Sequence, residues 1–258
     1  MRTNRAGTTS WQARLLSKDH RGSSNLDTST IKGLVFDLDG TLLDTLEGHA
    51  SSFNRALQKL QMPTHEIDAY RYFIGNGARV CAERSLPDDA VELADQCVAL
   101  FKEDYAETWQ ETTDPYLGIT DLLNAQSDKP CAVLSNKDDV FTQKMILRSF
   151  PNISFACVAG YGYQGIVKHK PDSSGPQLIA TKLGVDVTSL AMIGDTATDM
   201  ETARESGMTP IGVSWGFRDR EELILSGAKH VVDTPQALAE LLAGLTTLQT
   251  VIESSDNN

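Results

Sequence analysis

The sequence predicts an α/β protein, a doubly wound parallel sheet with a small α-helical cap inserted into it. From residue 114 onward, short apolar runs that favour strands alternate with runs of helical periodicity, the pattern of a parallel sheet covered by helices. Between residues 46 and 113, helical patterns follow one another with no convincing strand among them. A helical block of this kind between a first strand and the next α/β unit indicates an inserted cap.

Composition restricts the function classes. The 258 residues suffice for one large domain or two modest ones, and the net charge of −12 argues against a nucleic-acid partner, which would require a basic surface. The four cysteines at positions 81, 97, 131 and 157 lack the Cys-x-x-Cys spacing of a zinc site, so we expect free, mostly buried thiols in the reducing cytoplasm. No run of 18 apolar residues is present, and we expect no membrane span.

The two ends of the chain are polar. Residues 1–30 contain five Lys or Arg, two Asp or Glu and ten Ser or Thr without apolar periodicity, which predicts a disordered leader. An organellar transit peptide shares this bias, and a start codon assigned too far upstream explains the segment equally well. Residues 246–258 are expected to form a flexible tail.

The first strand of the predicted core, Leu34–Phe36, is followed directly by Asp37 and Asp39. Gly40 permits the sharp turn that must come next, so both acids lie at the carboxyl end of a buried strand, where α/β sheets bind ligands. Two carboxylates this close need either a proton or a cation such as Mg²⁺ between them. Asp37 is therefore a candidate nucleophile and Asp39 a candidate general acid and base. The structural alternative is an ordinary Asp-Gly turn.

The remaining elements follow in order. Residues 31–45 and 114–245 make the predicted core, and residues 46–113 the cap. Helices are expected in the cap at 46–60, 65–73, 78–85 and 88–110, and in the core at 119–125, 140–150, 177–183, 200–206, 221–226 and from 236 to about 245. Further strands are expected at 131–134, 155–158, 190–193, 210–213 and 230–232.

Polar side chains follow two of these strands. Ser135 and Asn136 come after the strand at 131–134 and offer a hydroxyl and an amide to a phosphoryl oxygen, although this dipeptide is also a routine strand-to-helix turn. Lys168 and Lys170 lie in the loop after the strand at 155–158. One ammonium group there would neutralise a phosphate, whereas a solvated basic loop is the alternative.

A second pair of acids, Asp195 and Asp199, follows the strand at 190–193. Residues four apart share one side of a helical turn, so both carboxylates can face the same cation. Alternatively, Asp195 caps the helix and Asp199 is a first-turn acid favoured by the helix dipole.

Taken together, the order and placement of these groups resemble the haloacid dehalogenase superfamily of phosphohydrolases. Its four motifs match Asp37-Leu-Asp39-Gly-Thr41, Ser135, Lys170 and Gly194-Asp195-x-x-x-Asp199, and the resemblance covers roughly residues 31 to 243. It implies a Rossmann-like sheet and a phosphatase reaction. Asp37 would attack phosphorus to form an aspartyl phosphate, and Asp39 would protonate the leaving oxygen and then activate water.

The resemblance also implies a ligand set. Mg²⁺ would be held by Asp37, the backbone carbonyl of Asp39, and Asp195, with Asp199 as a direct or outer ligand. The phosphoryl group would be bound by Thr41, Ser135, Asn136 and Lys170, the last in preference to Lys168.

Within the superfamily, the helical cap resembles the phosphoglycolate phosphatase-like branch. Similar segments are Gly75-Asn76-Gly77, Pro115-Tyr-Leu-Gly118, Lys170-Pro171 and Trp215-Gly-Phe-Arg218. The likeness implies a small phosphorylated metabolite such as 2-phosphoglycolate, and a monomer or homodimer. Asn76, Gly77 and Arg79 are candidate contacts for a substrate carboxylate, although a helix-start turn explains the glycines equally well.

Two other functions remain open. A sugar-phosphate mutase of the beta-phosphoglucomutase type shares the acid at position 39 and the helical cap, and would need a bisphosphate primer. A non-catalytic interaction module on the same fold is the alternative from another class, but it predicts decay of at least one motif, and all four are present.

Overall fold

The computed structural model describes residues 28–126 and 128–244. Of the expected leader, only residues 28–30 fall within this range, where Thr28–Thr30 form a short 3₁₀ helix, η1. Residues 1–27 and the expected tail at 246–258 lie outside it. No helix among the described residues has the length and apolar character needed to cross a membrane.

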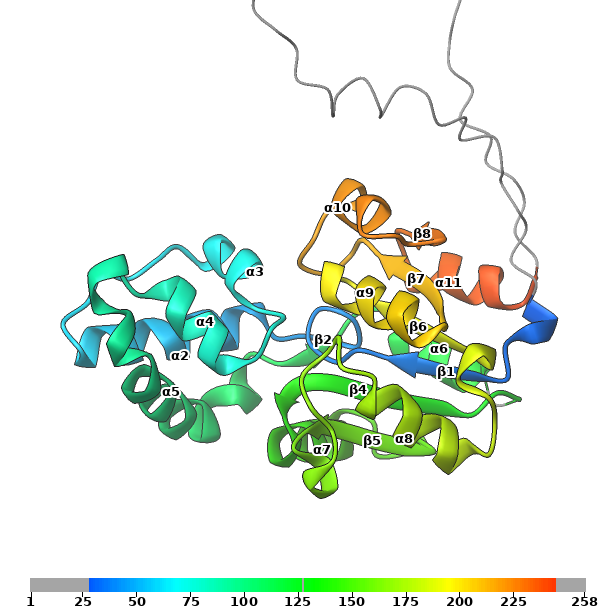
Figure 1. The fold of residues 1–258 in the computed structure, drawn as a ribbon. Helices are drawn as coiled ribbons and strands as arrows, with labels where there is room; N and C mark the ends of the chain where they lie inside the picture. Colours follow the sequence, from blue (N-terminus) through cyan, green and yellow to red (C-terminus); the bar gives the residue numbers. More distant parts are fainter. Residues whose placement is uncertain (1–27, 127, 245–258) are drawn as a thin grey trace, which may run out of the picture.

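The core is a six-stranded parallel sheet in the order β5-β4-β1-β6-β7-β8, which confirms the predicted fold class (Figure 1). The central strand β1 pairs with β4 on one side and β6 on the other, so that Phe36 lies opposite Val133 and Ile193. The residues that follow these three strands therefore meet at one edge of the sheet. The strands are β1 Gly33–Phe36, β4 Cys131–Asp138, β5 Cys157–Tyr161, β6 Leu190–Gly194, β7 Thr209–Val213 and β8 His230–Val232.

Helices cover both faces because successive strand residues point to opposite sides. Leu34 and Phe36 belong to a core cluster with residues of α6, α7 and α11, whereas Val35 between them packs in a second cluster with residues of α8 and α9. All four residues of β1 are buried. The core helices are α6 Ile119–Ala125, α7 Asp139–Ser149, α8 Ser174–Leu183, α9 Ala197–Ser206, α10 Arg220–Leu225 and α11 Pro235–Leu242.

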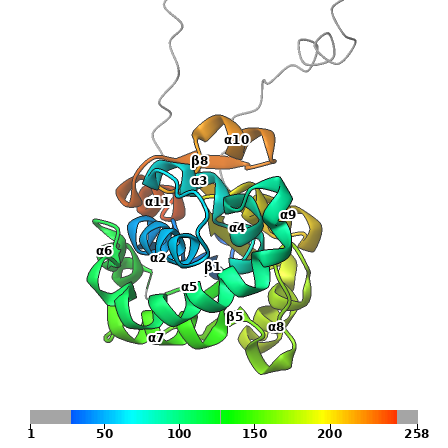
Figure 2. The same cartoon turned by 90° about the vertical axis from the view of Figure 1, so that its left-hand side faces the viewer.

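The inserted cap is joined to the core by a two-stranded antiparallel ribbon that the sequence did not reveal. Strand β2 (Leu43–Asp44) leads into the cap and β3 (Asp114–Pro115) leads out, with Leu43 opposite Pro115. Figure 2, viewed from the cap side, shows its helices in front of the sheet. They are α2 Leu46–Lys59, α3 Tyr70–Phe73, α4 Ala78–Ser85 and α5 Ala94–Thr108, with the 3₁₀ helices η2 Ile67–Ala69, η3 Asp88–Leu93 and η4 Trp109–Glu111.

Several expected elements differ in the structure. The helices expected at 65–73 and 88–110 are each divided into 3₁₀ and α-helical parts. The strand expected at 155–158 begins only at Cys157 and runs to Tyr161, because pairing of Cys157 with Ala132 sets the register and Phe155 packs against Phe150 before the strand starts. The strand expected at 131–134 continues to Asp138, and its end was concealed because residues 135–137 are polar but buried.

The helix expected at 200–206 begins three residues earlier, at Ala197. Its start is fixed by Thr196, whose backbone N–H and hydroxyl both donate to Asp199 Oδ2, at 3.0 and 2.7 Å. The first turn of α9 is therefore marked by a capping pattern between Thr196 and Asp199, and apolar periodicity appears only further along the helix.

The aromatic packing of the cap gives a stability prediction. Phe53 of α2 is fully buried, and its ring stacks on Phe101 of α5 with 3.9 Å between centroids. We expect Phe53→Ala to lower the free energy of unfolding by about 3–5 kcal/mol in denaturant titrations, through lost burial and the cavity left behind. Leu147→Ala is the control, because Leu147 is 74% exposed on α7 and its loss is expected to cost less than about 0.5 kcal/mol. Equal effects of the two substitutions would contradict this packing.

Candidate active site

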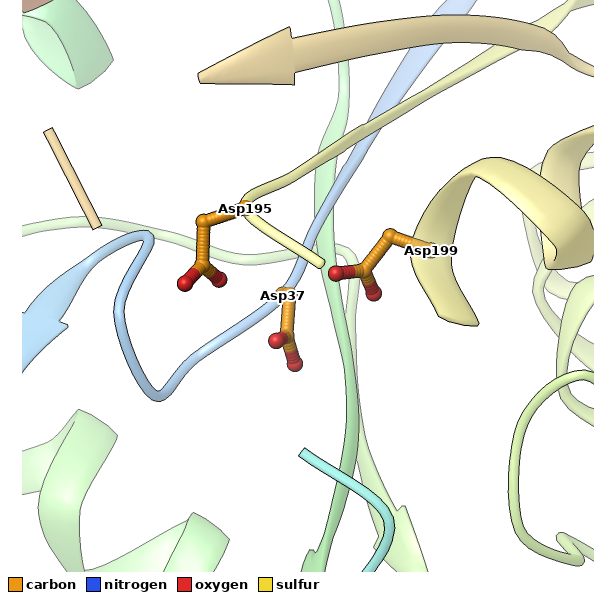
Figure 3. A group of neighbouring side chains, drawn as sticks. All are labelled: Asp37, Asp195 and Asp199. Atoms are coloured by element: carbon orange, nitrogen blue, oxygen red, sulfur yellow. The ribbon is translucent and has the colours of Figure 1, made fainter. Parts of the chain in front are cut away.

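Three buried carboxylates meet at the carboxyl edge of the sheet (Figure 3). Asp37 directly follows β1, Asp195 directly follows β6, and Asp199 lies in the first turn of α9. One oxygen atom from each lies within 4.8 Å of the others, and none of the three residues is more than 5% exposed. An all-oxygen set at this spacing suits a hard divalent cation such as Mg²⁺.

The second acid pair is held by specific hydrogen bonds. Asp195 Oδ2 accepts the backbone N–H of Phe217 at 2.7 Å, and Oδ1 accepts the hydroxyl of Thr41 at 3.1 Å. Thr41, expected to bind phosphate, thus donates its hydroxyl to a carboxylate of the acid cluster. Thr196, and not Asp195, is the N-cap residue of α9, so the simple capping alternative does not describe Asp195.

Lys170 is the lysine that reaches the acids. Its Nζ lies 2.7 Å from Asp37 Oδ1 and 2.6 Å from Asp199 Oδ1, and its side chain is 2% exposed. Lys168 is 73% exposed on its side chain and pairs with Asp172 instead. Burial by itself lowers the pKa of Lys170, but the neighbouring carboxylates Asp199 and Asp37 outweigh burial and raise it. Lys170 therefore stays charged.

One ammonium group does not balance three carboxylates. Burial raises the pKa of Asp195 to about 7, and repulsion from Asp199 adds to the shift. The pKa of Asp37 is raised well above its ordinary value, chiefly by burial and then by Asp199 and Asp195, although Lys170 opposes the shift. With all three carboxylates deprotonated, the cluster would carry an excess of negative charge in a buried site, and a bound divalent cation would relieve it.

The Asp39 carboxylate lies apart from this cluster. Its Oδ1 is 3.1 Å from Nζ of Lys137. Lys137 lies near the end of β4 and lines the cavity described below. Burial acts to raise the pKa of Asp39, but Lys137 and then His49 outweigh it and lower the pKa. Neither Lys137 nor His49 was identified from the sequence. The one feature of the sequence that could have pointed to Lys137 is its place directly after the Ser135-Asn136 pair.

The two polar residues after Leu134 have different surroundings. Ser135 is 2% exposed, and its Oγ accepts the backbone N–H of Lys137 at 3.1 Å. Both ends of the Asn136 amide are engaged, because Oδ1 accepts the backbone N–H of Lys170 at 2.6 Å and Nδ2 donates to the carbonyl of Gly75 at 2.9 Å. Asn136 thus ties the lysine loop to the cap.

The three cap residues expected to contact substrate also lie in different surroundings. Asn76 donates through Nδ2 to Thr198 Oγ1 at 2.8 Å, so it contacts the core at α9. Gly77 has a φ of +88°, and a Cβ there would lie 2.6 Å from Cε1 of His169, which leaves no space for a side chain. Arg79 faces solvent and pairs with Glu83 and Asp95 of the cap itself. It is not among the residues that line the cavity.

A cavity lies between cap and core above Asp37 and Asp39. Its cap side is largely apolar, with Phe53, Ile74 and Phe101 among its walls. The full lining comprises Asp37, Asp39, His49, Phe53, Ile74, Gly75, Gly77, Ala78, Cys81, Phe101, Lys102, Tyr105, Ser135, Asn136, Lys137, Asp138 and Phe141. A small phosphorylated molecule would be enclosed between the acids and these cap residues.

Comparisons with known proteins agree with this geometry. Residues 34–213 match the model of the family described as haloacid dehalogenase-like hydrolase. A phosphoglycolate phosphatase of Pectobacterium atrosepticum is 30% identical over 213 residues, covering 80% of this chain and 90% of that protein. A phosphoglycolate phosphatase of Pseudomonas putida is 29% identical over 228 residues, covering 84% of this chain and 82% of that protein.

Solved structures show the same architecture. A crystal structure from Lactobacillus delbrueckii subsp. bulgaricus aligns with a TM-score of 0.76 at 30% identity, covering 82% of this chain and 98% of that one. A haloacid dehalogenase-like family hydrolase from Streptococcus pneumoniae aligns with a TM-score of 0.74 at 24% identity, covering 84% of this chain and 100% of that one. At this identity the likeness concerns the fold alone. The resemblance predicted from the motifs is thereby confirmed, and the chain belongs to the haloacid dehalogenase-like hydrolase family.

Proposed function

We propose that this chain is a Mg²⁺-dependent phosphatase that hydrolyses a small phosphomonoester through a phosphorylated Asp37. The observation that carries the proposal is the convergence of Asp37, Asp195, Asp199 and Lys170 on one buried point beside a cavity. Phosphoryl transfer needs in-line positioning and compensation of charge, and this arrangement offers both. The names of the relatives from Pectobacterium and Pseudomonas support the same reaction class.

The reaction has two steps. In the first, an oxygen of the Asp37 carboxylate forms a bond to phosphorus as the bond to the leaving oxygen breaks, and protonated Asp39 gives its proton to that oxygen. In the second, the Asp39 carboxylate takes a proton from water, the water oxygen forms a bond to phosphorus, and the bond between phosphorus and the Asp37 oxygen breaks, which releases phosphate and restores the Asp37 carboxylate and protonated Asp39. The nearby Lys137 ammonium favours the deprotonated form of Asp39, which the second step requires.

The donor set fits Mg²⁺. Asp37, Asp195 and Asp199 would hold the ion together with the backbone carbonyl of Asp39, and the bound ion would neutralise charge on the phosphoryl oxygens and on Asp37. The chain's own residues supply the rest of the site. Ser135 and Lys170 would contact the phosphoryl group, Asn136 would act by fixing the backbone of Lys170, and Thr41 would act by orienting Asp195.

For the substrate, 2-phosphoglycolate is the first compound to test, because the relatives carry its name. Asn76 and Gly77 border the site and would restrict the leaving group, whereas Arg79 would have to leave Glu83 and Asp95 to reach it. We also propose a cytoplasmic location, supported by four buried free cysteines. Release of phosphate without a bisphosphate primer distinguishes the phosphatase from a mutase.

The nucleophile assignment predicts loss of turnover in Asp37→Asn. An amide cannot form the phosphorylated carboxylate, so we expect kcat for phosphate release to fall by about 10⁴-fold or more. The exposed Asp89 in η3 gives a matched control, and Asp89→Asn is expected to retain wild-type turnover. Substantial phosphate release by Asp37→Asn would exclude this residue as the nucleophile.

The metal assignment predicts dependence on the ion. Removal of divalent cations by a chelator should abolish phosphate release, and Mg²⁺ should restore it. Ca²⁺ should inhibit, because its larger and looser coordination shell disturbs the in-line approach of Asp37. Turnover that is undiminished in Ca²⁺, or in the chelator, would count against the proposed site.

The acid cluster also predicts a pH dependence of stability. The pKa of Asp195 is about 7 in the folded chain, against about 4 in the unfolded chain, so the folded state binds the Asp195 proton more tightly. This contribution to the free energy of unfolding is fully present below pH about 4 and is lost as the pH rises through about 7. Mg²⁺ needs the deprotonated carboxylates, so it should raise the melting temperature more at about pH 8 than at about pH 5. Thermal scans with and without Mg²⁺ test this, and Asp195→Asn should remove most of the difference. A Mg²⁺ effect that is independent of pH and of Asp195 would contradict the assignment.

A further inference from the structure

Lys137 has so far been described only by its effect on the charge of Asp39, yet its side chain also contacts residues on both sides of the boundary between cap and core. Its side chain is 6% exposed. Its Nζ lies 3.1 Å from Asp39 Oδ1, 2.8 Å from Nε2 of His49 in α2 and 3.5 Å from the hydroxyl of Tyr105 in α5. Lys137 thus joins the acid–base residue of the core to two helices of the cap.

His49 is arranged to accept a hydrogen bond from Lys137. Its Nδ1 lies 2.9 Å from the backbone carbonyl of Thr45, which can only accept, so the ring proton is assigned to Nδ1. Nε2 then has a free lone pair facing the ammonium group at 2.8 Å. Burial, and then the charge of Lys137, lower the pKa of His49 to about 4, which keeps the ring neutral. The ring packs against Tyr105 at a tilt and stacks on Phe101, with centroids 4.8 and 5.8 Å away.

The position of Asp39 relative to the acid cluster requires an explanation. It is two residues from Asp37, and a divalent ion among Asp37, Asp195 and Asp199 would attract any nearby carboxylate. The Asp39 side chain nevertheless lies outside that cluster, against Lys137. The Lys137 ammonium, 3.1 Å from Asp39 Oδ1, is a cation on the side away from that cluster.

We propose that Lys137 is a positioning residue for Asp39. Its ammonium group, oriented by neutral His49 of the cap, holds the Asp39 carboxylate toward the leaving-group side of the cavity and away from the three carboxylates that would bind the cation. This inference rests on the proposed function, because it assigns Asp39 the proton transfers of that reaction.

The test compares a substrate whose leaving group must be protonated with one whose leaving group need not be. Two substrates are compared, p-nitrophenyl phosphate, whose leaving group departs without a proton, and the alkyl phosphate with the highest turnover in a panel of alkyl phosphates. We expect Lys137→Met to lower kcat/KM for the alkyl phosphate by about 10²-fold and for p-nitrophenyl phosphate by less than about 10-fold. Asp39→Asn should show the same selective loss.

Lys102 provides the matched control. It also lines the cavity, from α5, but its Nζ pairs with Asp138 at 2.5 Å. Lys102→Met removes the same charge from the same cavity, and the ratio of kcat/KM between the two substrates should stay at the wild-type value.

A second pair of variants tests the contribution of His49 in the cap. His49→Leu should cause the selective loss, while His49→Gln, which retains an acceptor, should cause less of it.

The outcomes separate the two proposals. If Asp39→Asn loses both substrates equally, the proton-transfer role in the proposed function fails. If Asp39→Asn is selective and Lys137→Met is not, only the inference on Lys137 fails, because its role is then structural. Melting temperatures accompany every assay. Should Lys137→Met not fold, Lys137→Gln takes its place, and the absence of a selective loss in that variant overturns the inference equally.

Discussion

Three buried carboxylates that repel one another when charged dominate the electrostatics of this fold. One carboxylate oxygen each of Asp37, Asp195 and Asp199 lies within 4.8 Å of the others in a buried site, and the Lys170 ammonium pairs with Asp37 and Asp199. Keeping such charges together costs free energy that the surrounding fold must supply. The pairing of β1 with β4 and β6 places the segments that follow β1 and β6 side by side, and so brings Asp37 and Asp195 together.

The hydrogen bonds around the cluster follow from the same constraint. Thr41 and the backbone of Phe217 hold Asp195, Thr196 holds Asp199, and Asn136 holds the backbone of Lys170. Each donor comes from a segment distant in the sequence or from a helix start, so the hydrogen bonds orient these side chains without a ligand. A preorganised site of this kind suits electrostatic stabilisation of phosphoryl transfer.

The cap completes the enclosure through its loop at residues 74–77. Arg218 donates to the carbonyl of Ile74 at 3.1 Å, Asn136 donates to the carbonyl of Gly75, and Asn76 donates to Thr198. These three hydrogen bonds hold the cap loop against the edge of the sheet where the acids meet. The loop therefore belongs to the wall of the cavity. Its two glycines let it lie close to core side chains, because a Cβ at Gly77 would be 2.6 Å from the His169 ring and one at Gly75 would be 3.4 Å from Cγ2 of Thr196.

The extent to which sequence predicts this site depends on how each residue acts. The acids and Lys170 were predictable because they directly follow apolar strands or match motifs, and the register of a parallel sheet then brings them together. The contacts of Lys137 and His49 could not be predicted because they depend on packing between cap and core, which no spacing encodes. Arg79 was expected as a candidate contact for a substrate carboxylate because it is close in sequence to Gly77; that stays a prediction, and in the structure its side chain pairs with Glu83 and Asp95. The two-residue ribbon of β2 and β3 is too short for a periodic signal.

A crystal structure with Mg²⁺ and a beryllium fluoride mimic of the phosphoryl group would test the site directly. We expect beryllium bonded to a carboxylate oxygen of Asp37, with the metal ion contacted by Asp37 and Asp195 and with Lys170 beside the fluorines. A mimic bound elsewhere while Asp37 remains unmodified, or a metal ion bound away from these acids, would contradict it.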